Sequence, residues 1–320
     1  MTPPISVALC TFNGSPFLDE QLQSVAAQTL LPAELLIFDD GSSDDTVAVA
    51  RRFAGTAPFP VRVHVNQANL GCRGNFAACI AACTGETIVL SDQDDVWLPH
   101  KLERLAGVLA AQSGAAFAFS DALMADRHLN PLPWTLWEAK AFTAAERRAF
   151  ERRRGFDVLL RRQIVTGATL AFRARFRDLL LPIPPGWVHD EWIALVLSAV
   201  AWGVPLPEPL IRYRQHPRQQ IGERPRSLYE QYLRVRGRAH EDFVQAAGAV
   251  RAAEERLREK APQAGEAIRA LHRKFLHCDR RARMHAPGAR RWPLILGEWW
   301  PGNYRKYSRG WKSLAQDVFL

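Results

Sequence analysis

The sequence has few cysteines and no long run of uncharged residues. Its five cysteines form an odd number and include no Cys-x-x-Cys pair, which argues against a disulfide framework or a zinc site and predicts reduced thiols in the core. The uncharged stretch 192–207 is shorter than the roughly 18 residues that a membrane-spanning helix needs. The first residues lack a basic segment followed by an apolar one, so we expect no secretory signal and residence in the cytoplasm.

Charge is distributed unevenly along the 320 residues. Residues 1–120 hold 6 Lys and Arg against 12 Asp and Glu, a net charge of −6, whereas the whole chain carries +9, so the remaining 200 residues sum to +15. A basic half suits nucleic acid, anionic lipid headgroups or phosphorylated substrates. The sequence has no zinc-finger spacing and no RNP-like motif, and we therefore expect no nucleic-acid partner.

Hydrophobic patterning predicts an α/β fold for the first part of the chain. Apolar runs typical of buried strands alternate there with amphipathic segments typical of helices, which indicates a mainly parallel sheet covered on both faces. The predicted strands are 5–10, 34–38, 61–65 and 87–91, and the helices between them 16–28, 44–53 and 75–83. Further along, we predict helices over 99–112, within 138–163 and over 189–202, strands over 115–120 and 165–172, and two helices around Pro262 within 227–284.

Acidic side chains follow two of these strands. Asp39 and Asp40 come at the end of the second strand, and Asp92, Asp94 and Asp95 at the end of the fourth. Ligands of parallel sheets bind beyond the carboxyl ends of the strands, so these carboxylates should share one edge. Like charges gathered in one place repel unless a cation or a positive ligand lies between them. The Asp-x-Asp pattern therefore predicts a Mg²⁺ or Mn²⁺ site that holds a metal–diphosphate complex.

Three motifs occur together in an order that is more specific than any one of them. They are Val7-Ala-Leu-Cys-Thr-Phe-Asn-Gly14, Leu36-Ile-Phe-Asp-Asp-Gly-Ser-Ser-Asp-Asp45 and Ser91-Asp-Gln-Asp-Asp-Val-Trp97, followed by His189-Asp-Glu-Trp192 and Tyr213-Arg-Gln-His216. In these motifs the chain resembles the family 2 glycosyltransferases, and most of all their rhamnosyltransferase-like branch. The resemblance implies a GT-A type, Rossmann-like nucleotide-sugar-binding domain over residues 1–222, with a nucleotide-binding half (1–120) and an acceptor-binding half (121–222). Residues 223–320 would form an Arg-rich helical extension.

The same resemblance implies roles for the residues that bind the donor. Thr11, Phe12 and Asn13 would line the nucleobase, and Asp40 would accept a hydrogen bond from a uracil or thymine N3–H. Phe12 stands where the family usually has Tyr, so a ring stack survives without the hydroxyl. The loop that contains Arg73 and Asn75 would lie near the ribose.

The resemblance also implies which residues hold the metal and the diphosphate. Asp94 would ligate the metal, and Asp92 would contact the ribose or the shell of the metal. His216 lies in the segment that folds over the diphosphate in relatives, and it is a further metal ligand in this interpretation. Arg212, Arg214 and Arg218 are candidate phosphate contacts near it.

An inverting transfer needs a carboxylate that takes the proton from the attacking hydroxyl. By resemblance this is the aspartate that begins the helix after the acceptor-side strand, which Asp190 matches. Glu191 is the alternative. Successive helical residues point about 100° apart, so only one of the two can face the sugar. Residues 166–169 would lie on the acceptor side.

These features together predict an inverting glycosyltransferase that uses Mn²⁺ or Mg²⁺. It would move a sugar, rhamnose from dTDP-rhamnose by resemblance, from a dTDP- or UDP-linked donor to a lipid-linked or cell-surface glycan. The Arg-rich extension and its aromatic end, residues 292–300, suit peripheral contact with the inner face of the cell membrane. Two alternatives stay open: a nucleotidyltransferase acting on sugar phosphates, and a non-catalytic protein that binds membranes or nucleic acid.

Overall fold

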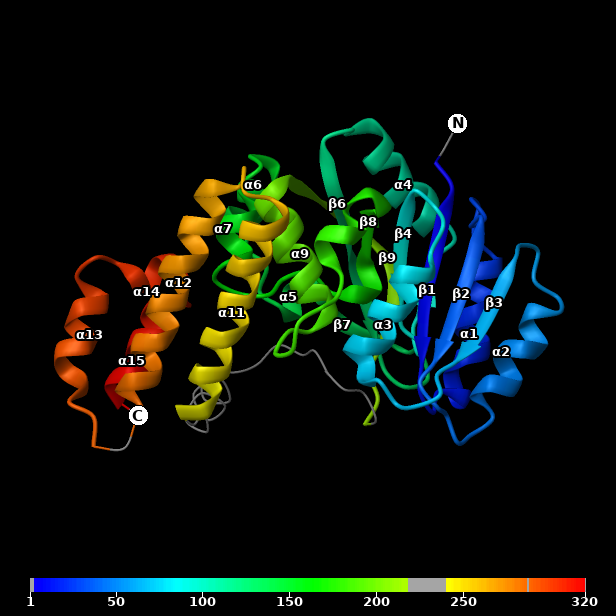
Figure 1. The fold of residues 1–320 in the computed structure, drawn as a ribbon. Coiled ribbons are helices and arrows are strands. Elements are labelled where there is room, and N and C mark those ends of the chain that lie inside the picture. The colour runs from blue at the N-terminus through cyan, green and yellow to red at the C-terminus, as the bar shows by residue number, and fades with distance from the viewer. Residues whose placement is uncertain (1–2, 218–239, 287, 320) are drawn as a thin grey trace.

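The structure is a computed structural model, and it describes residues 3–217, 240–286 and 288–319. In these residues nine strands form one sheet in the order β3-β2-β1-β4-β8-β6-β9-β5, with β7 paired to β6. The strands are β1 Ile5–Thr11, β2 Glu34–Asp39, β3 Val61–Val65, β4 Thr87–Ser91, β5 Val96–Trp97, β6 Ala115–Ala125, β7 Pro131–Thr135, β8 Leu170–Arg173 and β9 Trp202–Arg214. The predicted α/β class with a GT-A type sheet and C-terminal helices is confirmed (Figure 1).

Helices cover both faces of this sheet, and the side chains of β1 alternate between the two cores that result. Ala8 and Cys10 pack into the core that contains α3 and α9, whereas Val7 and Leu9 pack into the core that contains α1, α2 and α4. The bounds of these helices are α1 Ser15–Ala26, α2 Thr46–Ala54, α3 Gly71–Ala82, α4 Lys101–Ala111 and α9 His189–Val200. Burial on both faces explains why the strand reads as an unbroken apolar run.

The N-terminal half follows the predicted elements closely. β1 pairs in parallel with β2 and β4, and β2 pairs in parallel with β3, so the carboxyl ends of these strands lie at one edge. The largest difference is at α3, which begins at Gly71 rather than at the predicted residue 75. Gly71 has φ +69°, a conformation that glycine adopts without strain, and it turns the chain into the helix there.

The middle of the chain makes the sheet mixed. β8 pairs antiparallel with β4 and β6, whereas β9 runs parallel to β6. No strand is predicted over β9, because Pro205, Pro207 and Pro209 cannot donate to a ladder. The register of β6 against β9 shifts between Ser120 and Asp121, within this proline-containing stretch. The predicted strand 165–172 begins as a 3₁₀ turn, η1 Gly167–Thr169, and pairs only from β8 onward.

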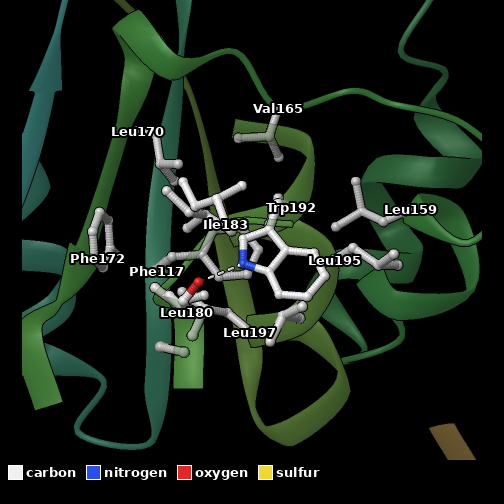
Figure 2. Packing of buried hydrophobic residues seen from close by; sticks show 14 of the residues in the cluster. Phe117, Leu159, Val165, Leu170, Phe172, Leu180, Ile183, Trp192, Leu195 and Leu197 are labelled. Carbon is white, nitrogen blue, oxygen red and sulfur yellow. Dashed lines mark hydrogen bonds between the residues drawn. The ribbon is translucent and has the colours of Figure 1, made fainter. Parts of the chain in front are cut away.

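The short helices α5 Leu136–Ala139, α6 Ala144–Glu151, α7 Gly155–Leu159 and α8 Arg177–Leu180 precede α9 in the chain. Of these, α7 and α8 pack against α9, and their Leu159 and Leu180 join the core around Trp192. The Trp192 side chain is fully buried, and its indole Nε1 donates to the Leu180 carbonyl at 2.8 Å. Figure 2 shows the ring enclosed by Leu159, Val165 and Leu197 among other apolar side chains. Because this indole holds the first turn of α9, it fixes the place of residue 190 at the start of the helix.

The C-terminal helices are α11 His240–Lys260, α12 Gly265–Met284, α13 Arg291–Trp299, α14 Asn303–Tyr307 and α15 Trp311–Phe319. The two helices predicted around Pro262 are confirmed, and the aromatic end forms α13. Val250, Leu257 and Leu271 join the same core as Trp192, so α11 and α12 pack against the part of the molecule that contains α9. The predicted domain boundary at 222–223 lies outside the described residues. Figure 1 shows α12–α15 at the opposite side of the molecule from β1–β3.

None of the described helices combines the length and the apolar character needed to cross a membrane. All five cysteines are described and have free thiols, of which Cys10, Cys79 and Cys83 are buried, as predicted for core thiols.

Candidate active site

A cleft of about 2260 Å³ lies along the carboxyl ends of β1, β2 and β4. Its walls include nearly all residues predicted to bind the donor or to act on it: Thr11, Phe12, Asn13, Asp40, Asn75, Asp92, Asp94, His216, Asp190 and Glu191. Arg73, Arg212 and Arg214 are the exceptions among the described residues. Arg73 Nη1 donates to the Ile183 carbonyl at 2.7 Å, so this residue braces the loop before α9. Segments distant in sequence therefore meet in one place.

The loops after β1 and β2 are tied together by side-chain hydrogen bonds. Asp39 accepts from Thr11 Oγ1 at 2.8 Å and from the backbone N–H and hydroxyl of Ser42 at 2.8 and 2.6 Å. Asn13 accepts from the Ser43 N–H at 2.9 Å, and its own N–H donates to Ser42 Oγ at 2.8 Å. Thr11 and Asn13 thus hold the wall of the cleft in shape, and their side-chain oxygens are engaged by protein groups.

Asp40 stands in a buried amide network at the end of β2. It is only 3% exposed, and its Oδ1 accepts from Asn66 Nδ2 at 2.9 Å and from the Leu70 N–H at 2.7 Å. Asn66 also donates to Asn75 Oδ1 at 2.9 Å, and Asn75 donates to the Phe38 carbonyl at 2.8 Å. Within the described chain no donor reaches Asp40 Oδ2, so that oxygen can accept from a ligand. Sequence reasoning missed Asn66, although it directly follows a predicted strand.

Gln93, between the two aspartates of the Asp-x-Asp pattern, clasps the loop after β1. Its Oε1 accepts from the Phe12 N–H at 2.9 Å and its Nε2 donates to the Phe12 carbonyl at 3.1 Å. Gly14 makes room for this clasp, because a Cβ at that position would lie 2.1 Å from Gln93 Oε1. The Phe12 backbone is held in this way while its ring stays 47% exposed. No role for Gln93 is predicted from the sequence.

Carboxylates crowd the end of β4. Burial, together with the neighbouring carboxylates of Asp94 and Asp190, raises the pKa of Asp92 to about 7. Burial is also the main cause that raises the pKa of Asp95 well above its usual range.

Among the described residues, two basic side chains are buried beside these carboxylates: Lys101, whose Nζ donates to the Ala168 carbonyl at 2.6 Å, and Arg214, whose backbone N–H donates to Asp95 Oδ1 at 3.0 Å. Burial lowers the pKa of Lys101 well below its usual range, so Lys101 offsets the acids little. The protein by itself therefore disfavours the ionised form of Asp92 and Asp95.

The segment after β9 closes over these acids. His216 Nε2 lies 2.8 Å from Asp94 Oδ2, and its ring centroid lies 4.7 Å from that of Phe17. Arg214 is 2% exposed, and its guanidinium donates to the carbonyls of Asp94 and Arg127, both at 2.7 Å. Arg214 therefore braces the acidic loop instead of meeting a phosphate. Arg212 is exposed and does not line the cleft, and Arg218 lies outside the described residues.

The donor atoms present fit a divalent cation only if a ligand completes the site. Within residues 3–217, 240–286 and 288–319, no three His, Cys, Asp or Glu side chains are arranged around one metal position. Asp94 and His216 are already in contact, and Asp92 lies close enough for the Asp94 charge to act on it. Mg²⁺ usually takes one or two carboxylates and fills its shell with water and substrate phosphates. An open site of this kind matches that preference.

Asp190 lies in the first turn of the helix that Trp192 anchors, and it lines the cleft. Its Oδ2 accepts from the Gly167 N–H at 2.9 Å and its Oδ1 from the Glu191 N–H at 2.7 Å. Gly167 has to be small, because a Cβ there would lie 2.7 Å from Nε2 of His189. His189 in turn stacks on Phe76 with ring centroids 3.8 Å apart. These contacts hold the Asp190 carboxylate in one orientation.

Glu191, the alternative base, also lines the cleft, but its environment differs. Burial and the Asp190 carboxylate raise its pKa to about 7, against the opposing effect of Lys140 and Lys274. A pKa near the operating pH suits a general base as well as a general acid, so this value does not exclude Glu191. Asp190 differs in that two backbone N–H groups fix its carboxylate, and it stays the predicted base with Glu191 as the alternative.

The far wall of the cleft is basic and comes from the C-terminal helices. Trp299, Arg305, Arg309, Trp311 and Lys312 line it together with the acids described above. The sequence predicts membrane contact for this part of the chain and no role in the cleft. Its composition was the only signal, because no motif or spacing indicates that residues 299–312 contribute to the cleft that also contains Asp92 and Asp94.

Comparison with known proteins supports the predicted family. The sequence profile described as "Glycosyl transferase family 2" matches residues 6–178. A glycosyltransferase of Nostoc sp. that is itself uncharacterised is 38% identical over 126 residues, which cover 39% of this chain. The chain spans between 36% and 59% of the length of the curated relatives that it matches first.

Solved structures resemble the whole described fold. The S. aureus protein TarS, solved with UDP-GlcNAc, has a TM-score of 0.55 at 17% identity and covers 92% of this chain and 75% of its own. A mannosyltransferase of Pyrobaculum calidifontis, solved with GDP-Man and Mn²⁺, has a TM-score of 0.53 at 18% identity and covers 99% and 86%. At these identities the likeness shows the fold alone.

Proposed function

The chain belongs to glycosyltransferase family 2, and on this premise we propose that it transfers one sugar from a nucleotide-diphosphate donor to an acceptor hydroxyl, with inversion at the anomeric carbon. The observation that carries the proposal is the meeting of Asp40, Asp94 and Asp190 in one cleft. Their places suit three different tasks: to bind a base, to help hold a diphosphate, and to accept a proton. Surface carboxylates with only structural roles would not converge in this way.

The donor we propose carries uracil or thymine. Asp40 Oδ1 is held by Asn66 and Leu70, and its Oδ2 remains available for a base N3–H. The exposed Phe12 ring, with its backbone clasped by Gln93, offers a face on which the base can stack. Within this class we propose dTDP-rhamnose, on the resemblance of the motifs to rhamnosyltransferases. Asn75, which supports Asn66, would lie near the ribose.

A divalent cation, Mn²⁺ or Mg²⁺, is part of the proposal. Asp94 and His216 would hold it, with Asp92 beside them. When bound, such an ion supplies positive charge to the diphosphate that leaves. The crowded carboxylates at the end of β4 support this assignment, because a cation would relieve their mutual repulsion.

In the proposed transfer one bond forms, one bond breaks and one proton moves. The acceptor oxygen forms a bond to the anomeric carbon, and the bond from that carbon to the diphosphate oxygen breaks. The bonding pair leaves with the nucleoside diphosphate, and the proton of the acceptor hydroxyl passes to the Asp190 carboxylate. Backbone N–H groups of Gly167 and Glu191 fix that carboxylate, so it need not reorient during the reaction.

The acceptor we propose is a lipid-linked or cell-surface glycan, reached by peripheral attachment to the inner face of an anionic membrane. Large apolar side chains stand exposed on α13, directly after it and on α15: Trp292 is 57%, Leu296 58%, Trp300 86% and Phe319 73% exposed. Arg291, the first residue of α13, and Arg290 before it lie near them in sequence. Aromatic and basic side chains on one surface favour the interface of an anionic bilayer.

A donor panel tests this function directly. The protein is heated with dTDP-rhamnose, other dTDP-sugars and UDP-sugars, with and without Mn²⁺ or Mg²⁺, and the released products are identified. We expect metal-dependent stabilisation by one donor class and slow release of its sugar. Asp94→Ala should abolish the metal-dependent part of the shift, whereas Asp190→Asn should keep the shift and lose transfer.

Glu191→Gln is the matched control for Asp190→Asn, since both change a neighbouring carboxyl to an amide. If Glu191→Gln loses transfer and Asp190→Asn does not, the base is Glu191. Release of pyrophosphate from a nucleoside triphosphate would indicate a nucleotidyltransferase instead. Absence of donor binding under every condition would leave a non-catalytic binding protein and would end the proposal.

A further inference from the structure

The loop that leads into α9 is held through its carbonyl groups. Residues 181–188 join α8 to α9, and three of them have no N–H to donate: Pro182, Pro184 and Pro185. The Pro182 carbonyl accepts a hydrogen bond from Arg256 of α11 at 2.7 Å, and the Ile183 carbonyl accepts one from Arg73 of α3 at 2.7 Å. The place of this loop therefore depends on side chains from other helices.

Arg256 connects the loop with both of the helices that it joins. Its Nη1 donates to the Leu179 carbonyl of α8 at 2.9 Å, and its Nη2 donates to the Pro182 carbonyl. Its guanidinium also lies over the indole of Trp192 in α9, with Cζ 5.2 Å from the ring centroid. A guanidinium presents its donors in a planar fork, so a single side chain can bridge two carbonyls in this way.

A second contact with α11 fixes the loop directly before α9. Trp187 Nε1 donates to the Ala249 carbonyl at 2.7 Å, and the centroid of its ring lies 5.8 Å from that of Trp192. Gly186 has φ +83° and passes close to the same residue of α11, because a Cβ on it would lie 3.4 Å from Ala249 Cβ. Helix α11 thus holds the loop at its start and again shortly before Asp190.

We propose that Arg256 is a positioning residue for the transfer, because it fixes the loop from which α9 presents the Asp190 carboxylate. This inference rests on the proposed function, in which Asp190 is the base. The Trp192 side chain keeps α9 in the core without Arg256, so loss of Arg256 should shift the first turn of the helix and not unfold it. Arg256 does not line the cleft, and it should therefore act on the rate of transfer and not on donor affinity. A misplacement of about 1 Å can cost about a hundredfold in rate.

Amide hydrogen exchange of the full chain tests the position of Asp190 without any substrate. The reporter is the Gly167 N–H, because it donates to Asp190 Oδ2 at 2.9 Å. In Arg256→Gln we expect this amide to exchange about fivefold faster, the factor that one lost hydrogen bond corresponds to, while the amides of β1 exchange as in the wild type. Asp190→Ala gives the rate for an amide that has lost its acceptor. An unchanged Gly167 rate in Arg256→Gln overturns the inference.

The rate of sugar release tests the consequence for the reaction. The donor is the nucleotide sugar that the panel above identifies, at saturating concentration with Mn²⁺, and water is the acceptor. We expect release to fall about ten- to a hundredfold in Arg256→Gln, while the dissociation constant of UDP with Mn²⁺ stays at the wild-type value. Arg256→Lys keeps the charge without the fork and should lie between the two. Faster Gly167 exchange with an unchanged release rate would show a structural role alone and overturn the inference.

The matched control is Arg251→Gln, the same substitution on the same helix. Arg251 forms an exposed pair with Glu255, and the variant should behave like the wild type in both measurements. Equal effects of Arg251→Gln and Arg256→Gln would show a general effect on α11 and overturn the inference.

Trp187→Phe is the second variant if Arg256→Gln does not fold, because it keeps an aromatic ring and removes the hydrogen bond to the Ala249 carbonyl. We expect faster Gly167 exchange and slower sugar release in this variant, with UDP affinity unchanged. Wild-type values of both would overturn the inference. A wild-type protein that binds no UDP and releases no sugar would instead refute the proposed function, and the exchange measurement would still report whether Arg256 positions Asp190.

Discussion

Two regions line the same cleft: the loops at the carboxyl ends of β1, β2 and β4 together with the start of α9, here called the strand edge, and the C-terminal helices α11–α15, here called the helical lobe. Their polar side chains are used in opposite ways. At the strand edge the functional residues are themselves fastened: Asp40 by Asn66, Phe12 by Gln93, and Asp190 by Gly167. In the lobe, Glu298 and Asp317 are 0% exposed and pair with the buried His277 and Arg281, whereas Trp300 and other tryptophans stand exposed.

This difference separates two kinds of substitution. A change at the strand edge should alter donor binding or transfer while the free energy of unfolding changes little, because the loops stand on the buried parallel strands β1, β2 and β4. A change in the interior of the lobe should lower the stability of the lobe and leave the donor site intact. The following predictions test that separation, in order of decreasing effect.

Asp317→Ala should have the largest effect on stability. Its carboxylate accepts from Arg281 Nε at 2.8 Å and from Tyr304 Oη at 2.8 Å, and it lies at 3.0 Å from His285 Nε2. Without it, the buried Arg281 charge loses its partner, which costs about 3–5 kcal/mol. Urea titration should show this loss, whereas donor binding should persist.

Asp279→Ala is the control for Asp317→Ala, since it removes a carboxylate from an exposed pair with Arg283 in the same lobe. Exposed pairs contribute about 0–1 kcal/mol, so we expect little change. If Asp317→Ala abolished donor binding under native conditions, the two regions would not be separable, and the comparison above would fail.

Glu191 sits where the two regions meet, because Lys274 of α12 acts on it. Its pKa of about 7 in the folded protein exceeds the ordinary value of 4.5, so the folded state holds the proton more tightly than the unfolded chain. The free energy of unfolding should then fall as pH rises from 4.5 to 7, by roughly 3 kcal/mol at most. Glu191→Gln lacks this loss.

The measurement for Glu191 is the free energy of unfolding of wild type and variant at pH 5 and pH 8. We expect Glu191→Gln to gain stability relative to the wild type at pH 8 more than at pH 5. Asp190, Lys140 and Lys274 face the same carboxyl and are present in both proteins. A difference between variant and wild type that does not depend on pH would show that Glu191 titrates normally.

Gly14→Ala tests the strand edge with a smaller change. The new Cβ would lie 2.1 Å from Gln93 Oε1 and displace the amide that holds both backbone groups of Phe12. Each lost hydrogen bond contributes about 1 kcal/mol, so donor affinity should fall roughly tenfold or somewhat more. The control is Gln93→Ala: combined with Gly14→Ala it should add little, because both changes break the same clasp. Additive effects would refute this account.

The N-terminal half of the fold could be predicted from sequence patterns, because there the local hydrophobic pattern agrees with the long-range pairing of the strands. The four parallel strands with their helices, and the convergence of Asp40, Asp92 and Asp94, follow from apolar runs that end in acids. The pairing of β9 with β6 could not be predicted in this way. The prolines of β9 argue against a strand, and the strand forms because it pairs with β6, which is distant in sequence.

Side-chain partners were harder to predict than elements. The sequence predicts a phosphate contact for Arg214, but its buried guanidinium donates to carbonyls far along the chain. It predicts no role for Gln93, whose side chain holds the Phe12 backbone. Neither contact has a fixed spacing that a single sequence reveals. The same holds for Arg305 and Trp311, whose place in the cleft depends on how the helical lobe packs on α9.

Phe12→Leu should have the smallest effect and gives the finest measure of the strand edge. The ring is 47% exposed and its backbone is held by Gln93, so loss of the ring removes a stacking face without disturbing the loop. An aromatic stack contributes about 0.5–1.5 kcal/mol beyond its buried area, which predicts a two- to roughly twelvefold weaker donor affinity by calorimetry. Phe12→Tyr keeps the face and should change affinity less than about threefold. If Phe12→Leu also lowered the thermal midpoint by several degrees, the ring would be part of the scaffold, and the assignment of this loop to the base would lose its support.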